Sequence, residues 1–371
     1  MKITAAVVNE KGGRFDLQKM ELDDPKNNEV LVKIKATGTC HTDMAARDGI
    51  MGIPPLPVVL GHEGAGIVEK VGPGVDKVKP GDHVVLTFGF CGKCLNCKKG
   101  LPAYCYHFME LNFAGCRMDG SHSHHQSGAD IHDNFFSQSS FGTYAIAHEN
   151  NVVKIPDDVP LEIMGPLGCG IQTGAGAVIN SLKAGPGSGI AISGIGAVGL
   201  AALMAAHASG CFPIIAIDIN ASRLDTAKQL GATHTINSKE QDVEKAVRKI
   251  VAQGLDFVFD TTGRSDVINS GLNSLKPHGI CGIVGIGSKP LEIDMNSFVA
   301  RGIQLKGIVE GDSVPDSFIP LLIDLYRSGR FPFDKLIKTY AFEDINRAIA
   351  DSEEGHTIKP VILIGDYVEK S

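Results

Sequence analysis

The chain has 371 residues, of which 43% are hydrophobic and 21% charged, and its formal net charge is −7. This composition predicts a folded protein of two domains, because single cores rarely grow beyond about 250–300 residues. The acidic balance, without any run of basic residues, argues against a nucleic-acid partner. The start, MKITAAVVNEKGG, lacks the apolar stretch of a signal peptide, so we expect a cytoplasmic protein with reduced cysteines.

Short strands and turns are predicted throughout the first 150 residues. Segments with the β-branched content of strands lie at 30–35, 64–71 and 84–86. Glycine and proline residues at 71–75 and 79–82 mark turns around them. This pattern predicts a small β-barrel.

Three residues of metal-binding type lie beside glycines and acids, in Cys40-His-Thr-Asp, Gly-His62-Glu-Gly and Gly-Cys169-Gly. Two cysteines and a histidine supply three protein ligands and leave a fourth position open, which is the arrangement of a catalytic zinc. Each residue alone has an ordinary structural interpretation, so the prediction depends on all three together. We expect Asp43 to accept the second ring N–H of His62, and Glu63 to modulate the metal field from behind.

Four further cysteines follow the spacing C-x2-C-x2-C-x7-C: Cys91, Cys94, Cys97 and Cys105. Four thiolates in one short loop predict a closed, tetrahedral, structural zinc site. The alternative is a pair of disulfides. Cysteines three residues apart in one loop make poor disulfide partners, and an oxidising compartment is not expected.

The segment 117–133, RMDGSHSHHQSGADIHD, is polar and is predicted to be an exposed loop. Its residues His122, His124 and His125 could suggest another metal site, but the composition favours solvent-exposed histidines.

Strands and helices are predicted to alternate after about residue 169. Helical patterns occupy 222–230 and 240–253, and apolar strand segments occupy 190–193, 214–218, 232–237, 257–260 and 280–285. This alternation predicts a parallel, doubly wound sheet. The uncharged stretch 189–206 is shorter than the roughly 20 residues of a membrane span, so no membrane partner is expected.

A dinucleotide fingerprint lies between the first of these strands and the following helix. Gly194, Gly196 and Gly199 fit G-x-G-x-x-G, and Asp218 ends the next strand. The glycines allow a tight turn, approach of a pyrophosphate and close helix packing. Asp218 is predicted to bind the adenosine ribose and to repel a 2′-phosphate, which favours NAD, although Arg223 nearby could accept that phosphate.

At these motifs the chain resembles the zinc-dependent medium-chain alcohol dehydrogenases. The resemblance spans nearly the whole chain and rests on CHTD at 40–43, GHEGAG at 61–66, CGKCLNC at 91–97, GCGIQTG at 168–174, GIGAVG at 194–199 and DIN at 218–220. The segments 165–174 and 135–141 resemble more specifically the aryl (benzyl) alcohol dehydrogenase branch.

The resemblance implies an α/β fold with two domains. A β-rich, GroES-like catalytic domain is expected at 1–173 and 310–371, where the C-terminal segment returns to the first domain. A Rossmann domain is expected at 174–309. The implied cofactors are two Zn²⁺ ions per chain and NAD.

The resemblance also implies roles for single residues. Thr42 is the hydroxyl that takes the substrate proton. His41 and Lys359 match cations that bind the cofactor pyrophosphate, whereas Thr173 and Val198 match positions that pack against the nicotinamide.

The predicted reaction is hydride transfer between NAD and a primary alcohol or aldehyde, such as benzyl alcohol and benzaldehyde. A formaldehyde- or polyol-type dehydrogenase on the same scaffold is one alternative, and a non-catalytic NAD-binding relative is another. A homodimer or homotetramer is implied, with the strand 303–309 pairing across a two-fold axis. The alternative is a strand covered within its own chain.

Overall fold

The computed structural model describes residues 1–50, 52–287, 289–365 and 367. The chain forms two compact units. The first consists of Met1–Cys169, Val314–Leu321 and Asp334–Ser371, and the second of Gly170–Ser313 and Leu322–Phe333. The boundaries predicted from the sequence were 173/174 and 309/310. Three segments that the sequence placed in the first domain belong to the second unit: 170–173, 310–313 and 322–333.

Two β-sheets make up most of the first unit. One has the strand order β4-β1-β2-β7-β8, and the other has the order β10-β6-β5-β3-β18-β17, with β9 also paired to β3. Their strands are β1 Lys2–Val8, β2 Phe15–Leu22, β3 Glu29–Gly38, β4 Val58–Val59, β5 Glu63–Val71, β6 His83–Leu86, β7 His124–Gln126, β8 Ala129–Ile131, β9 Tyr144–His148, β10 Val152–Lys154, β17 Ile337–Ala341 and β18 Lys359–Leu363. The helices of this unit are α1 His41–Arg47, α2 Leu95–Lys98, α3 Phe108–Phe113, α4 Leu161–Met164 and α12 Ile345–Glu353.

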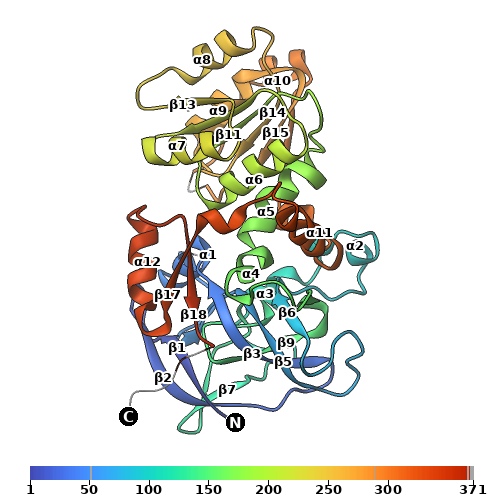
Figure 1. Ribbon diagram of the computed structural model, residues 1–371, viewed down its shortest axis with the longest axis vertical. Helices are drawn as coiled ribbons and strands as arrows, with labels where there is room; N and C mark the ends of the chain where they lie inside the picture. Colours follow the sequence, from blue (N-terminus) through green and yellow to red (C-terminus); the bar gives the residue numbers. More distant parts are fainter. Residues whose placement is uncertain (51, 288, 366, 368–371) are drawn as a thin grey trace. The chain divides into compact units, whose positions relative to one another are not determined.

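The C-terminal strand β18 is part of a sheet formed mainly by the N-terminal region. It pairs antiparallel with β3, and in Figure 1 the red β18 runs beside the blue β3. Strand β3 also pairs with β5, which begins at Glu63. The pairing of β5, β3 and β18 therefore brings Glu63 and Lys359 close together, although 296 residues separate them in the sequence.

The histidine-rich segment 117–133 differs from the prediction of an exposed loop. It forms the hairpin β7–β8, which extends the first sheet by pairing β7 with β2. His124 and Asp133 are buried, and the Asp133 carboxylate accepts hydrogen bonds from the His124 backbone N–H at 2.9 Å and ring Nδ1 at 3.0 Å. Burial alone would raise the pKa of Asp133, but the His122 and His124 imidazoles lower it well below its usual range. The prediction was wrong for His124, because sheet pairing, which composition does not reveal, buries it with Asp133. Residues 127–130 at the turn are exposed, as predicted, and His125 is partly exposed.

The second unit contains a six-stranded, entirely parallel sheet. Its strand order is β13-β12-β11-β14-β15-β16. From the central strand β11, the chain adds β12 and β13 on one side and then β14, β15 and β16 on the other. This is the order of a Rossmann fold. The strands are β11 Ile190–Ser193, β12 Ile214–Asp218, β13 His234–Asn237, β14 Leu255–Asp260, β15 Leu275–Ile283 and β16 Gln304–Gly307.

Helices connect these parallel strands, and the central strands are apolar on both faces. Every residue of β11 and β12 is buried, as expected for strands covered on two sides. The helices are α5 Gly170–Gly176, α6 Ala197–Ala208, α7 Ala221–Gln229, α8 Val243–Ile250, α9 Ser265–Ser274 and α10 Met295–Arg301, and α11 Pro315–Arg327 follows them. Among the described residues, no helix is both long and apolar enough to cross a membrane.

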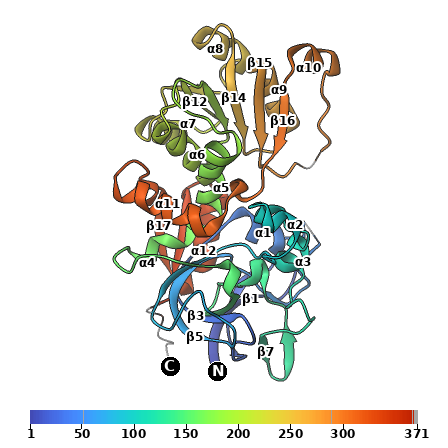
Figure 2. The same cartoon turned by 90° about the vertical axis from the view of Figure 1, so that its right-hand side faces the viewer.

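Strand β16 is the last strand on its side of the sheet. It pairs with β15, and Figure 2 shows it outermost beside β14 and β15. The described residues place no strand against its other side. An edge of this kind carries unpaired backbone donors and acceptors that can bond to another chain.

Candidate active site and dinucleotide site

The predicted ligand Cys40 lies where β3 passes into α1. It is the N-cap residue of α1, and its backbone N–H donates to the Asp43 side chain at 3.0 Å. The other Asp43 oxygen accepts from the Gly61 N–H at 3.1 Å and lies 2.9 Å from His62 Nδ1. A single buried carboxylate therefore fixes the cap of α1, the turn before β5 and the His62 ring. This contact leaves His62 Nε2 as the nitrogen that can bind a metal.

The third predicted ligand, Cys169, follows a tight turn that packs directly on β6. Thr87 Oγ1 donates to the Gly168 carbonyl at 2.7 Å. A Cβ atom on Gly168 would lie 2.0 Å from the Leu86 carbonyl oxygen, so only glycine allows this approach. The turn brings a buried thiol to the ligands from β3 and β5.

The structure brings four potential ligands together: Cys40, His62, Glu63 and Cys169. One ligand atom from each lies within 4.8 Å of those from the other three. His62 Nε2 is buried and has no hydrogen-bond partner. A buried ring nitrogen without a partner is costly unless it binds a metal or water, and two thiols and an imidazole are a donor set that zinc prefers. The residues present therefore fit a zinc ion.

The charges around this cluster favour a metal-binding thiolate in the metal-free chain. The Cys169 thiol, as a hydrogen-bond donor, lowers the pKa of Cys40 well below its usual range despite burial, and His62 adds to this. Burial opposes a charged His62, but the Asp43 carboxylate raises the pKa of His62 above its usual value. Both effects stabilise a negative sulfur beside a positive or metal-bound imidazole.

Glu63 and Lys359 form a buried ion pair behind the ligand cluster. Lys359 Nζ lies 2.8 Å from each Glu63 oxygen and 3.0 Å from the Thr39 carbonyl oxygen. Burial raises the pKa of Glu63 to about 7, although the Lys359 ammonium opposes that shift. The predicted pyrophosphate contact of Lys359 has no support here, because its three donors point at Glu63 and Thr39. Local sequence gave no signal for this pairing, since it depends on β18 entering the sheet.

Two other predicted residues lie on the first turn of α1. Thr42 Oγ1 is 3.7 Å from Cys40 Sγ, which places a hydroxyl beside the ligand cluster. His41 is exposed on the helix surface. The structure thus places the Thr42 hydroxyl next to one of the predicted ligands.

The four cysteines of the 91–105 loop form a separate cluster. Their sulfur atoms lie within 4.8 Å of one another, and three of the separations are 3.5, 3.9 and 4.0 Å. A tetrahedral zinc with Zn–S bonds of about 2.3 Å requires S–S separations of about 3.8 Å, whereas a disulfide requires about 2.05 Å. The backbone N–H groups of Cys97 and Tyr106 donate hydrogen bonds to the Cys94 sulfur and lower the pKa of that thiol to about 6. The geometry fits a closed zinc site, and all nine cysteines are free.

The glycine fingerprint forms the turn between β11 and α6. Gly194 has φ +87°, and a Cβ atom on Gly199 would lie 1.9 Å from the Gly194 carbonyl oxygen. Asp218, at the end of β12, accepts from the Ile195 N–H at 2.6 Å and from the Asn220 N–H at 2.8 Å. These bonds fix its carboxylate beside the turn, where lone pairs remain for ribose hydroxyls.

A pocket of about 740 Å³ opens beside Asp218 in this unit. Its walls include Gly194 and Asp218 and also Ile219, Lys239 and Arg264. The sequence interpretation missed the last three, although Lys239 and Arg264 follow the carboxyl ends of β13 and β14. Ligands of doubly wound sheets bind at that edge, so this position was the available signal. Arg223 does not line the pocket.

Thr173 and Val198 lie on α5 and α6 of the same unit. The Thr173 hydroxyl donates to Glu310 at 3.2 Å, and Val198 is partly exposed. A Cβ atom on Gly174 would lie 2.0 Å from the Val198 carbonyl oxygen, so α5 and α6 pack closely. Within this unit, Thr173 and Val198 thus come from adjacent turns of two tightly packed helices.

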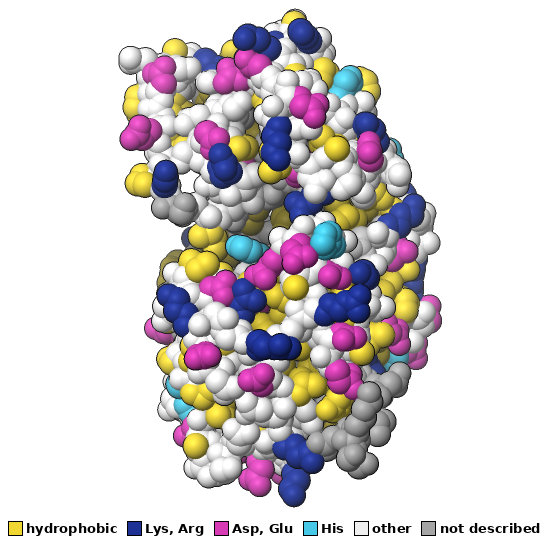
Figure 3. Space-filling model, turned by 90° about the vertical axis from the view of Figure 1, so that its left-hand side faces the viewer, with side chains coloured by type: hydrophobic (Ala, Val, Ile, Leu, Met, Phe, Trp, Pro, Cys, Tyr) yellow, Lys and Arg dark blue, Asp and Glu magenta, His cyan; other side chains and the backbone are white. Residues whose placement is uncertain are grey.

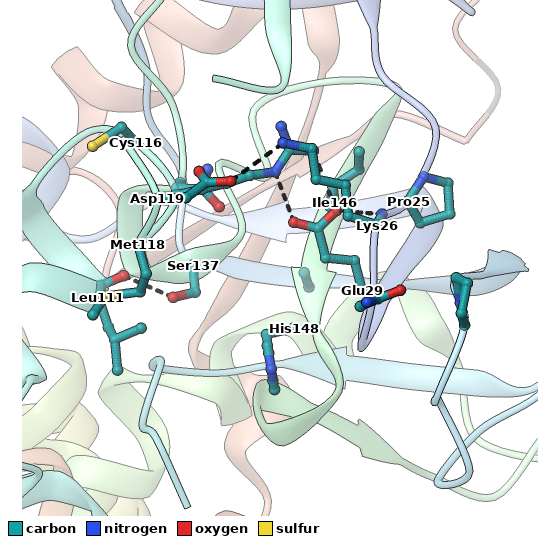
Figure 4. Close-up of a pocket in the computed structure, with 15 residues that line it drawn as sticks. Pro25, Lys26, Glu29, Leu111, Cys116, Met118, Asp119, Ser137, Ile146 and His148 are labelled. Atoms are coloured by element: carbon teal, nitrogen blue, oxygen red, sulfur yellow. Dashed lines mark hydrogen bonds and ion pairs between the residues drawn. The ribbon is translucent and has the colours of Figure 1, made fainter. Parts of the chain in front are cut away.

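A second pocket, of about 670 Å³, lies in the first unit away from these ligands. Lys26, Glu29 and His148 are among the side chains that line it (Figure 4). Arg117, also in its wall, donates to Glu29 at 2.7 Å and to Asp23 at 3.0 Å. None of the predicted zinc ligands lines this pocket, and the Arg117 guanidinium in its wall is already paired with carboxylates.

Comparisons with known proteins agree with this description. Residues 26–157 match the alcohol dehydrogenase GroES-like domain, and residues 197–328 match the zinc-binding dehydrogenase family. The chain therefore belongs to the zinc-binding alcohol dehydrogenases and is an enzyme. Zinc, one of the two cofactors predicted from the sequence, is named in the description of this family.

Three relatives illustrate the likeness. The chain is 45% identical to the geraniol dehydrogenase of Castellaniella defragrans, over 97% of both chains. It is 49% identical to the benzyl alcohol dehydrogenase of Acinetobacter calcoaceticus, whose crystal structure it matches with a TM-score of 0.94 over 98% of this chain and 99% of that one. An alcohol dehydrogenase zinc-binding domain protein from Burkholderia ambifaria is 50% identical, with a TM-score of 0.96 over 98% and 99% of the chains.

Proposed function

We propose that this alcohol dehydrogenase oxidises aryl alcohols such as benzyl alcohol, with NAD as the hydride acceptor. The observation that carries the proposal is the 49% identity to the benzyl alcohol dehydrogenase of Acinetobacter calcoaceticus over 98% of this chain. An aromatic cluster also packs against the ligand His62. Phe136 stacks on the His62 ring with centroids 4.3 Å apart, Phe135 contacts that ring edge-on at 5.4 Å, and Phe113 packs on Phe136 at 5.0 Å. All three phenylalanines are buried, so their rings support the His62 ring from within the core.

The chain's own residues prepare the site for this reaction. Cys40, His62 and Cys169 would hold the zinc, Asp43 orients His62, and Thr42 takes the proton that leaves the alcohol hydroxyl. When bound, zinc makes a coordinated hydroxyl more acidic, and NAD accepts the hydride. A reducing cytoplasm, which keeps the thiols available, suits this chemistry.

A substrate panel tests the proposal. Burying a phenyl ring of about 100 Å² contributes about 2.5 kcal/mol, which corresponds to roughly 50-fold or more in kcat/KM. We expect benzyl alcohol to exceed ethanol by at least this factor and sorbitol by more, in steady-state assays that follow NADH absorbance. Cinnamyl alcohol and geraniol serve as comparators. Higher kcat/KM for sorbitol or for the formaldehyde adduct of a thiol than for benzyl alcohol would establish the polyol- or formaldehyde-type alternative.

The preference for NAD over NADP rests, in this proposal, on Asp218. Its carboxylate lies at the wall of the nucleotide pocket and would repel a 2′-phosphate. We expect Asp218→Ser to raise KM for NAD about tenfold or more and to narrow the gap between NAD and NADP. Initial rates with both cofactors at fixed benzyl alcohol measure the change. The matched control is Asp225→Ser, an exposed carboxylate on the following helix α7. Equal use of both cofactors by the wild type would contradict this role.

We also infer a homo-oligomer in which β16 pairs with a second copy. The strand is a sheet edge, and Val299 of the neighbouring α10 is 70% exposed. A charge on this strand should weaken the contact, so Leu305→Glu is expected to shift the protein toward a monomer in sedimentation velocity at micromolar concentration. A wild type that sediments only as a 39.3 kDa monomer would contradict the inference.

A further inference from the structure

The segment 134–141 has an unusual backbone for its burial. Asn134, Phe136, Ser137 and Ser139 have φ values of 55°, 52°, 53° and 49°, in the left-handed region that favours glycine. Five consecutive residues from Ser137 to Phe141 are nevertheless buried. Left-handed conformations of non-glycine residues cost free energy and persist where the surrounding contacts determine them. The contacts of this segment must therefore stabilise its left-handed backbone.

The Gln138 side chain binds the backbone on both sides of Glu63. Its amide nitrogen donates to the His62 carbonyl oxygen at 3.0 Å, and its oxygen accepts from the Gly64 N–H at 3.1 Å. The side chain is 1% exposed, so these bonds have no competition from bulk water. Gln138 thus fixes the start of β5, including the ligand His62.

The same amide reaches the segment that carries Cys169. Its nitrogen also donates to the Thr87 carbonyl oxygen at 3.1 Å, and the Thr87 hydroxyl donates to the Gly168 carbonyl oxygen at 2.7 Å. Gly168 directly precedes Cys169 in the chain. One buried amide therefore connects the backbone of one ligand with the backbone beside another.

The ring of His62 is held by the same segment. Phe136 lies nearly parallel to the imidazole, at an interplanar angle of 22°, while Phe135 meets it at 82°. Asp43 holds the ring edge at Nδ1. The strained backbone is what places the Phe136 ring and the Gln138 amide on the same ligand.

We infer that Gln138 is a positioning residue for the zinc site, fixing His62 directly and Cys169 through Thr87 and Gly168. The bonds hold the ligands at metal-binding distance before the metal arrives, which lowers the entropic cost of binding. The inference rests on the assignment of Cys40, His62 and Cys169 as zinc ligands and is independent of the choice of alcohol.

The test measures zinc release in Gln138→Met, which keeps a similar side-chain length and removes all three hydrogen bonds. Purified holoenzyme is mixed with a colorimetric zinc chelator, and the time course of zinc release is recorded. A kinetic phase that is present in the wild type and absent from Cys169→Ala is assigned to zinc from the catalytic site. We expect that phase to become at least tenfold faster, whereas the phase from the four-cysteine site keeps its rate. In the cobalt-substituted protein, the visible d–d bands should change in position or intensity.

Asn112→Leu is the matched control for loss of a buried amide. Asn112 is fully buried, and its side chain bonds to the Gly89 backbone at 2.7 and 2.9 Å and to the Phe108 carbonyl oxygen at 2.7 Å. These hydrogen bonds do not involve the backbone of His62, Thr87 or Gly168. We expect it to lower Tm without accelerating the catalytic-site phase. Thr87→Val, which removes only the hydroxyl link to Gly168, should accelerate that phase by a smaller factor and gives a second measurement if Gln138→Met does not fold.

A lowered Tm for Gln138→Met with wild-type zinc release and cobalt bands would make Gln138 an ordinary core amide and overturn the inference. So would wild-type release from Thr87→Val when Gln138→Met fails to fold. If Cys169→Ala retained both zinc ions, the assignment of Cys169 as a ligand would instead be contradicted. The two failures are therefore distinguishable.

Discussion

Replacing Cys169 by alanine should remove one of two zinc ions and lower kcat/KM by about 10⁴-fold, while the protein stays folded. Cys169 is 7% exposed and is one of the two thiols in the catalytic cluster. Without it, two ligands and a carboxylate already paired to Lys359 remain. Loss of metal-assisted chemistry costs several kcal/mol of transition-state stabilisation, and about 5 kcal/mol corresponds to roughly 10⁴-fold.

Metal analysis, circular dichroism and benzyl alcohol kinetics check this prediction together. Cys281→Ala is the matched control, because Cys281 is a fully buried thiol in β15 that belongs to the core of the second unit. It should lose some stability but retain both zinc ions and most of the activity. Cys169→Ala protein that still contains two zinc ions would contradict the assignment of the ligand.

Replacing Cys97 by alanine should mainly destabilise the protein. The loop around it has little other support, since α2 contains no buried residue and Leu95 is 54% exposed. In such a loop the free energy of zinc binding is folding free energy. Loss of about 4 kcal/mol or more from this unit corresponds to a Tm lower by roughly 10 °C.

Thermal denaturation and limited proteolysis measure this effect. Cleavage should begin within residues 91–113 in Cys97→Ala and spare that region in the wild type. Cys116→Ala, a change just outside the cluster, should leave Tm and the cleavage pattern nearly unchanged. An unaltered Tm in Cys97→Ala would show that the loop folds without its metal.

The sequence predicted the parts of the site whose chemistry is local. The four cysteines lie within fifteen consecutive positions, so their spacing alone brings them together. Asp43 is three residues from Cys40, and the capping geometry of α1 places it where it can also reach His62. The parallel sheet was predictable because its central strands β11 and β12 are short apolar runs, each followed by a helix.

What the sequence did not predict depends on pairing between distant strands. Lys359 meets Glu63 because β18 lies beside β3, and composition carries no information on that register. The same reason explains why His124 at the start of the hairpin 124–131 is buried, where Asp133 accepts its hydrogen bonds. The sequence gives no separate signal for Gln138 within the segment 135–141, since a buried glutamine and an exposed one look alike in sequence.

The late position of β18 also orders events during synthesis. The end of β3, from Ala36 to Gly38, pairs with β18. Lys359, the first residue of β18, forms the ion pair with Glu63. At about 5–20 residues per second, a ribosome needs roughly 15–60 s to add the 296 residues between Glu63 and Lys359. During that time the edge of β3 that pairs with β18 is uncovered in the nascent chain. The Glu63 carboxylate also lacks the Lys359 ammonium with which it pairs in the folded protein. The four-cysteine loop, whose ligands emerge almost together, can bind zinc first, and the ligands Cys40 and His62 are joined by Cys169 near the middle of synthesis. Only the ion pair between Glu63 and Lys359, behind those ligands, must wait until the chain is nearly complete.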